Sequence, residues 1–261
     1  MDLKIGKKRA IVCGSTAGIG EAIAIGLSKE GAEVILVARD EEKLKKTIRK
    51  LKTDHGQQHT YIIADFSRPE ELNEQIRKGI VGKTVHILIN NTGGPAGGKA
   101  SEALTDDYLK AFQQHLICNQ YLVKATLPSM REAGFGRIIN IISTSVKQPL
   151  SNLGVSNTIR GAVANWAKTL ANELGEYNIT VNNVLPGATL TGRLESILQN
   201  RSLQSGRSLE EEAALMQKAI PANRFAEPDE VADAVLFLAS ERAAYINGVN
   251  LPVDGGRLGC L

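Results

Sequence analysis

Three glycines spaced to cradle a phosphate group lie near the amino terminus, in residues 14–20. An apolar run at residues 10–13 predicts a buried strand before them, and the apolar spacing from Ile19 onward predicts a helix after them. Glycine permits a tight turn and close approach of backbone N–H groups, and a helix start attracts negative charge. The segment predicts a dinucleotide site, with an ordinary tight turn as the alternative. The residues predicted to contact the cofactor here are Gly14, Ser15, Thr16, Gly18, Ile19 and Gly20.

Two charged residues follow the next two predicted strands. Arg39 follows strand 33–38, and Asp65 follows strand 61–64. In dinucleotide folds the second strand ends at the adenosine ribose, where a carboxylate favours a free 2′-hydroxyl and an arginine accommodates a 2′-phosphate. Arg39 therefore favours NADP(H) over NAD(H), although Asp40 argues against this, and Asp65 could face the adenine. A solvated loop charge is the alternative interpretation of Arg39.

Strands and helices alternate along the whole chain. Such alternation gives parallel βαβ units with right-handed crossovers, and hence an α/β doubly wound sheet with its ligand at the carboxyl ends of the strands. No change of composition marks a linker, so residues 1–261 are expected to form one domain, with a mobile substrate lid in the polar helical segment 190–225. Strands are predicted at 10–13, 33–38, 61–64, 85–89, 137–142, 180–185 and 248–253. Helices are predicted at 19–30, 41–52, 69–80, 104–130 (interrupted at Pro128), 154–174 and 228–240.

The composition excludes several classes of protein. The net charge of +3 is small and evenly spread, so no nucleic-acid partner is indicated. Three widely spaced cysteines without a CxxC motif predict neither a disulfide framework nor a metal site. We find no long apolar segment, signal peptide or membrane span, and expect a cytoplasmic protein.

Further motifs occur in a fixed order after the glycine segment. They are Asn90-Asn91-Thr92-Gly93, the run from Asn140 to Ser143, Pro186-Gly187 followed by Thr191, Asn247-Gly248, and Val253-Asp254-Gly255-Gly256. With the glycine motif, they resemble the short-chain dehydrogenase/reductase family over essentially the whole chain, and within it the 3-oxoacyl-[acyl-carrier-protein] reductases. Cys13 and Thr92 replace the usual Thr and Ala.

The resemblance implies a Rossmann fold, an oxidoreductase activity and a small-molecule or acyl-thioester substrate. It also implies a homotetramer or homodimer, assembled through the two long helices at 104–130 and 154–174. Ser143 matches the family's catalytic serine. The matching cofactor-binding positions are Asn91, Gly93, Pro186, Gly187 and Thr191.

The chain departs from the family at its catalytic pair, Tyr-x-x-x-Lys. With the register fixed on Leu170–Leu174, the tyrosine position falls on Ser156 and the lysine position on Arg160, and no tyrosine lies between Tyr121 and Tyr177. A serine hydroxyl is a far weaker acid than a phenol, and arginine does not give up its proton. The usual proton relay is therefore absent.

The replacement residues suggest other roles. Ser156 and Arg160 are four residues apart and share one helix face, so Arg160 could hold the nicotinamide ribose or an anionic substrate group, or only a structural carbonyl. The family's helix asparagine falls on His115, a candidate proton donor or a structural residue. Loss of a general acid costs about 10²–10⁴-fold in rate, so turnover with water as the proton source remains feasible. We therefore expect an NADP(H)-dependent oxidoreductase with an atypical proton donor. The alternatives are an NADP(H)-binding sensor or scaffold, and non-redox chemistry on the same fold.

Overall fold

The computed structural model describes residues 2–260 and shows one seven-stranded parallel sheet between two layers of helices. The strand order is β3-β2-β1-β4-β5-β6-β7, so the chain reverses its direction of travel across the sheet between β1 and β4. This confirms the predicted doubly wound fold. The strands are β1 (Arg9–Cys13), β2 (Glu33–Ala38), β3 (Thr60–Ile63), β4 (Ile87–Asn90), β5 (Gly136–Ile141), β6 (Ile179–Pro186) and β7 (Asn250–Val253).

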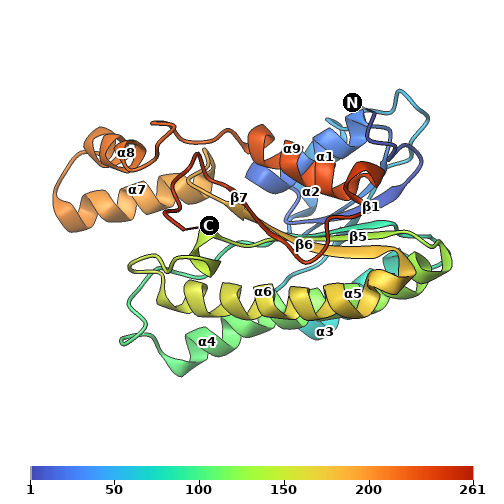
Figure 1. Ribbon diagram of the computed structural model, residues 1–261, viewed down its shortest axis with the longest axis horizontal. Helices are drawn as coiled ribbons and strands as arrows, with labels where there is room; N and C mark the ends of the chain where they lie inside the picture. Colours follow the sequence, from blue (N-terminus) through green and yellow to red (C-terminus); the bar gives the residue numbers. More distant parts are fainter. Residues whose placement is uncertain (1, 261) are drawn as a thin grey trace.

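Alternate residues of the central strands supply two separate cores. Val12 and Ile89 lie in the cluster under one helical layer, whereas Ile11 and Leu88 lie in the cluster under the other. Because both faces are covered, these strands are apolar on both sides, as their uninterrupted apolar runs predicted. One layer contains α1 (Gly18–Lys29), α2 (Glu41–Ile48) and α9 (Pro228–Ala239); the other contains α3 (Pro69–Gly79), α5 (Cys118–Glu132) and α6 (Gly154–Leu174) (Figure 1).

The helical stretch predicted at 104–130 differs from the expectation. It consists of α4 (Thr105–Phe112), a π-helical turn (Gln113–Ile117) and α5, and Pro128 lies inside α5 without ending it. The departure from α-helical geometry therefore falls at His115 and not at the proline. Single π turns inside α-helices recur at functional sites, because they turn a side chain away from the regular spacing.

Four asparagine amides connect neighbouring strands near the carboxyl edge of the sheet. Asn90 donates to Asn140, Asn140 to Asn183, and Asn183 to Asn250, each through Nδ2 to Oδ1 at 2.8 Å. The backbone register places each pair directly opposite each other. This row of amides, called here the asparagine ladder, fixes β4 to β7 relative to one another.

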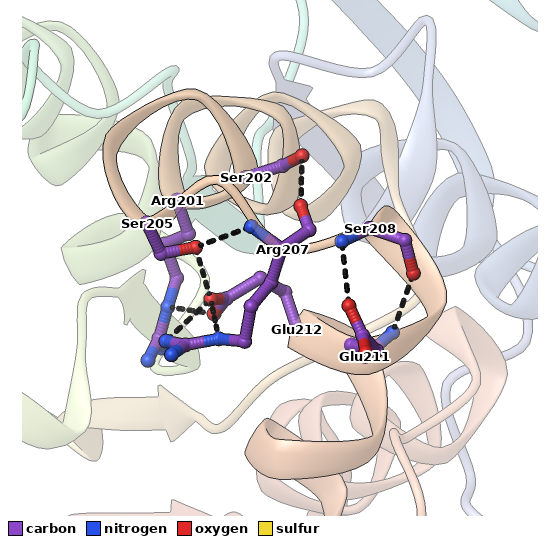
Figure 2. Close-up of polar contacts among 7 residues, drawn as sticks. All are labelled: Arg201, Ser202, Ser205, Arg207, Ser208, Glu211 and Glu212. Carbon is purple, nitrogen blue, oxygen red and sulfur yellow. Dashed lines mark hydrogen bonds and ion pairs between the residues drawn. The ribbon is translucent and has the colours of Figure 1, made fainter.

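The segment predicted to be a lid contains two helices, α7 (Gly192–Ser205) and α8 (Leu209–Lys218), which project beyond the end of the sheet (Figure 1). Figure 2 shows what ties them together: Glu212 on α8 accepts hydrogen bonds from Ser205, Arg201 and Arg207. The Glu212 side chain is only 1% exposed, so this carboxylate is buried with its partners around it. The α7–α8 hairpin is therefore an internally braced unit.

Candidate active site

The glycine segment forms the turn between β1 and α1. Gly14 and Gly18 have φ angles of 56° and 54°, in the left-handed region that favours glycine. A Cβ on Gly14 would lie 2.8 Å from the backbone oxygen of Asn91, and one on Gly20 would collide with Gly14. Ala17, the N-cap of α1, makes no side-chain cap bond, so the first N–H groups of α1 have no side-chain partner. This arrangement fits a pyrophosphate.

Ser15 and Asn91 support this turn through their side chains. The Ser15 hydroxyl is fully buried and donates to the Val37 carbonyl at 3.4 Å. The Ser15 side chain therefore ties the turn to β2, and the cofactor contact expected at Ser15 stays a prediction. Asn91 donates to the carbonyls of Cys13 and Gly14 at 3.2 and 3.3 Å, so its amide joins the end of β4 to the turn. Thr16 and Ile19, in contrast, are partly exposed.

The adenosine end of the site carries an exposed arginine. Arg39, at the end of β2, makes no ion pair within residues 2–260, and its charge contributes to lowering the pKa of Asp65. The main cause of that shift is the hydrogen bond from Ser67 N–H to Asp65. Asp40 caps α2 by accepting from Lys43 N–H at 3.0 Å. The carboxylate that argued against a 2′-phosphate is thus turned to the helix, while Arg39 remains available.

The segments that follow β4 and β6 carry further residues that are predicted to bind the cofactor. A Cβ on Gly93 would meet open space, which leaves room for a ligand after β4. Gly187, after Pro186, packs so closely on Asp254 that a Cβ would lie 2.7 Å from its Cα. Thr191, the N-cap of α7, lies beside Gly18 of the glycine turn, where its Cγ2 would be 2.8 Å from a Cβ. The structure thus places Thr191 and the glycine turn in contact.

The two candidate catalytic serines have free hydroxyl capacity. Ser143 follows β5, and its Oγ accepts from Ser145 N–H at 3.1 Å while donating to none of the described residues. Its proton is therefore available to a substrate oxygen. Ser156 lies in the first turn of α6 and is 8% exposed. Its hydroxyl has no hydrogen bond within residues 2–260.

Arg160 lies one turn beyond Ser156 on the same face of α6 and is 7% exposed. Its Nη1 donates to the Ile141 carbonyl at 2.9 Å, so the structural-carbonyl contact considered from the sequence is present. Burial, and then the nearby charge of Arg193, lower the pKa of Arg160 to about 10. The guanidinium stays protonated at neutral pH and forms a buried positive charge beside the end of β5.

His115 is 1% exposed in the π-helical turn, and its Nε2 has no hydrogen-bond partner in the part of the chain described. Burial, together with the charge of Arg160, lowers the pKa of His115 to about 3. The ring is consequently neutral at physiological pH. The neutral ring argues against His115 as a proton donor, because desolvation and the neighbouring cation suppress the imidazolium form that this role requires.

The positions of the five tyrosines bear on the missing phenol. None of the five tyrosines is hydrogen-bonded to Ser143, Ser156, Arg160 or His115 within residues 2–260. Tyr108 packs with Val155 and Ile159, the neighbours of the serine and arginine along α6. The remaining four are Tyr61, bound to Glu41; Tyr121, on α5; Tyr177, under Arg131; and Tyr245, fully exposed.

One residue near the site was missed from the sequence. Arg193, in the first turn of α7, donates through Nη2 to the Pro95 carbonyl at 2.8 Å and acts on the pKa of Arg160. Its position two residues after Thr191 was the available signal. The contact joins the start of α7 to the glycine-rich loop of residues 93–98.

Comparisons with known proteins agree with this geometry. Residues 14–257 match the family model described as enoyl-(acyl carrier protein) reductase. The chain is 35% identical to the uncharacterized oxidoreductase YvaG of Bacillus subtilis, covering 98% of each chain. It is 36% identical to the 3-oxoacyl-[acyl-carrier-protein] reductase FabG of Haemophilus influenzae, covering 95% of this chain and 97% of FabG.

A solved structure extends the likeness to three dimensions. The L-sorbose reductase of Gluconobacter frateurii, complexed with NADPH and L-sorbose, superposes with a TM-score of 0.93 at 33% identity, over 100% of both chains. No helix within residues 2–260 has the length and apolar character needed to cross a membrane. The ordered motifs, the seven-stranded sheet and these matches together show that the chain belongs to the short-chain dehydrogenase/reductase family of oxidoreductases.

Proposed function

We propose that this protein is an NADP(H)-dependent oxidoreductase that reduces a carbonyl group, or oxidises the matching alcohol, with an atypical proton donor. One observation carries the proposal: an intact dinucleotide turn lies at the same sheet edge as the unused Ser143 hydroxyl and the buried Arg160 cation. The first feature binds a cofactor, and the other two suit a polar substrate group. The substrate is a small molecule or an acyl thioester.

The residues that would hold the cofactor fit NADP(H). Gly14, Gly18 and Gly20 permit the tight turn, because a side chain at each would collide with Asn91, Thr191 or Gly14, and the start of α1 offers N–H groups to the pyrophosphate. Arg39 is free for a 2′-phosphate because Asp40 is occupied in capping α2. The similar L-sorbose reductase was solved with NADPH, which supports the same choice. When bound, the cofactor supplies or accepts a hydride at the carbonyl carbon.

The chain's own side chains would then act on the substrate oxygen. Ser143 orients the carbonyl by donating its free hydroxyl proton in a hydrogen bond. Arg160 supplies a fixed positive charge that holds the nicotinamide ribose or an anionic group. Ser156, one turn from Arg160, relays a proton from water to the oxygen. This relay replaces a phenol with a weaker acid, so turnover slower by about 10²–10⁴-fold is expected relative to a tyrosine-containing relative.

Two further expectations belong to the same proposal. The braced α7–α8 hairpin covers the substrate as a lid, as its contact at Thr191 with the glycine turn supports. Assembly into a tetramer or dimer would cover exposed apolar residues of the 104–112 region, Leu104, Leu109 and Phe112. Light scattering after size-exclusion chromatography measures the oligomeric state directly, and a monomer would contradict the expected assembly.

The decisive assay follows NADPH absorbance with a panel of ketones and β-ketoacyl thioesters, and NADP⁺ with the corresponding alcohols. Turnover with a carbonyl substrate, lost in Ser143→Ala, supports the proposal. NADPH binding without turnover in either direction contradicts it.

A second function is favoured by the loss of the tyrosine and the neutral state of His115: an NADP(H)-binding sensor or scaffold. It predicts enhanced NADPH fluorescence without consumption of the cofactor. In that case the double variant Ser156→Tyr, Arg160→Lys also stays inactive towards simple ketones. Activity gained by this variant, on an inactive background, would instead show that the pocket still admits a carbonyl substrate.

A further inference from the structure

Two arginines from different helices converge on one glycine. The position that a Cβ of Gly94 would occupy lies 3.6 Å from Nη2 of Arg160 and 3.7 Å from Nη2 of Arg193, the nearest atoms in residues 2–260 apart from its chain neighbours. Arg160 comes from α6, and Arg193 from the first turn of α7. Because Gly94 has no side chain, room for about a methyl group is left between these two guanidinium groups and the loop.

Each guanidinium is fixed by one backbone carbonyl and has donors left over. Arg160 uses Nη1 on the Ile141 carbonyl at 2.9 Å, which leaves Nη2 directed to the Gly94 position. Arg193 uses Nη2 on the Pro95 carbonyl at 2.8 Å. A guanidinium has five N–H donors in a planar fork, so the unused ones remain for a ligand. Both side chains are therefore held in place before any ligand arrives.

The electrostatics of the pair lack a counter-charge. Neither arginine forms an ion pair with an acidic residue in positions 2–260. Burial, and then the charge of Arg193, lower the pKa of Arg160. A buried cation that faces another cation is unfavourable unless an anion compensates it. Arg193 is exposed, so an anion can enter from the solvent side.

The position of the pair assigns the anion to the substrate. The expected cofactor phosphates lie elsewhere on the sheet edge, at the start of α1 beside β1 and at Arg39 after β2. Both guanidinium groups instead lie beside Gly94 in the loop after β4, and Arg160 also contacts the end of β5. The chain leads from that end of β5 to Ser143. Carboxylates accept two parallel hydrogen bonds from guanidinium groups.

We propose that Arg160 and Arg193 together bind a carboxylate of the substrate, so that the enzyme acts on oxo acids in preference to their esters or thioesters. This inference rests on the proposed reductase function and narrows its substrate class. Esterification removes the negative charge while leaving the carbonyl group intact, and it therefore isolates the contribution of the pair.

The test compares levulinate with methyl levulinate, and acetoacetate with methyl acetoacetate, as substrates with NADPH. The native protein should favour each acid by at least about tenfold in kcat/KM, as one charge-assisted contact provides. Arg193→Leu should remove most of that preference by raising KM for the acid far more than KM for the ester. Gly94→Val should do the same by filling the room beside the guanidinium groups. Arg77→Leu, an exposed arginine on α3, is the control for the change in net charge.

Three outcomes separate this inference from the function on which it rests. Equal turnover of acid and ester overturns the anion site and leaves the reductase intact. Weaker NADPH binding in Arg193→Leu, with the acid preference retained, assigns the pair to the cofactor phosphates and overturns the inference. If no carbonyl is reduced, the melting temperature of the NADPH-saturated protein is measured with levulinate and with its ester. Stabilisation by the acid alone, lost in Arg193→Leu, supports the site without the reductase; equal responses overturn it.

Discussion

The two halves of the sheet's carboxyl edge bind in different ways. Over β1 to β3, the expected ligand contacts are backbone N–H groups of a glycine turn and one exposed arginine, Arg39. Over β4 to β6, they are side chains: within residues 2–260, Ser143 keeps an unused proton and the buried Arg160 lacks an acidic partner, while the buried His115 nearby has an unpaired nitrogen. The site over β1 to β3 is formed mainly by the backbone. The site over β4 to β6 keeps polar side chains without full hydrogen-bond or charge partners, which costs folding free energy.

This difference teaches which half tolerates change. A backbone site depends on main-chain geometry, so most side chains around it are replaceable while the glycines are not. A side-chain site can exchange its functional groups, as the proposed replacement of the family's tyrosine and lysine by Ser156 and Arg160 illustrates. The following substitutions test that contrast.

The largest effect is expected for Gly14→Val. The substitution places a β-branched side chain at a φ of 56° and 2.8 Å from the Asn91 backbone oxygen. Strain and overpacking together should cost about 4 kcal/mol, or about 10³-fold in NADPH affinity, measured by fluorescence titration. Gly134→Val is the matched control, since its φ is 59° and its surroundings are open. Equal losses in both variants would contradict a special role for the turn.

Ser143→Ala should act on the other half alone. Removing one hydrogen-bond donor to the reacting oxygen typically lowers kcat by about 10²–10³-fold, and NADPH affinity should not change. Steady-state kinetics with the best carbonyl substrate measures the first effect, and titration the second. Ser145→Ala, a buried neighbour whose Oγ has no partner within residues 2–260, should keep its activity. A similar loss in both serine variants would remove Ser143 from the mechanism.

Arg39→Leu should change which cofactor is preferred. Loss of a contact between arginine and phosphate should cost about 2 kcal/mol, or about 30-fold in NADPH affinity, and leave NADH affinity unaltered. Competition titrations with both cofactors measure the ratio, and Arg49→Leu, an exposed arginine at the end of α2, controls for net charge. The result that would sink this assignment is a parallel loss for NADPH and NADH.

The smallest effect concerns stability at acid pH. The pKa of His115 is about 3 in the folded protein and about 6.5 when unfolded, so the unfolded state binds a proton first as the pH falls. Stability is therefore lost from pH 6.5 downward, by about 1.4 kcal/mol at pH 5.5. Urea unfolding at pH 7.5 and 5.5 should show a smaller drop in His115→Asn than in the native protein. An identical drop would contradict the buried neutral state, and the exposed His55→Asn variant controls for substitution itself.

Much of the fold could be predicted from the sequence because its signals are local. Apolar runs marked every strand to within a few residues, and the turn glycines marked the cofactor half. The π-helical turn at Gln113–Ile117 was not predicted, because one extra residue in a helix leaves no mark in composition. Pro128, by contrast, predicted an interruption of the helix, but α5 continues through it in the packed structure.

The chemical half of the site depends on contacts between distant residues. Ser156 and Arg160 were identified through the resemblance to the family, but the Arg160 bond to Ile141 and the approach of Arg193 require α6, β5 and α7 to be placed in space. His115 shows the same limit, since its charge state follows from burial and from a cation on another helix. Residue type alone suggested an acid where the environment forms a neutral ring.

The asparagine ladder has a consequence for how this edge can vary in evolution. Asn140 and Asn183 each accept one of these hydrogen bonds and donate the next, in one direction from Asn90 to Asn250, so rotating either amide would oblige its neighbours to rotate too. The asparagine ladder therefore holds its four strands together in a single arrangement of hydrogen bonds. Residues in the loops after these strands can therefore be exchanged to accept new substrates, while the asparagine ladder keeps the strands, and so the loops, at the same spacing.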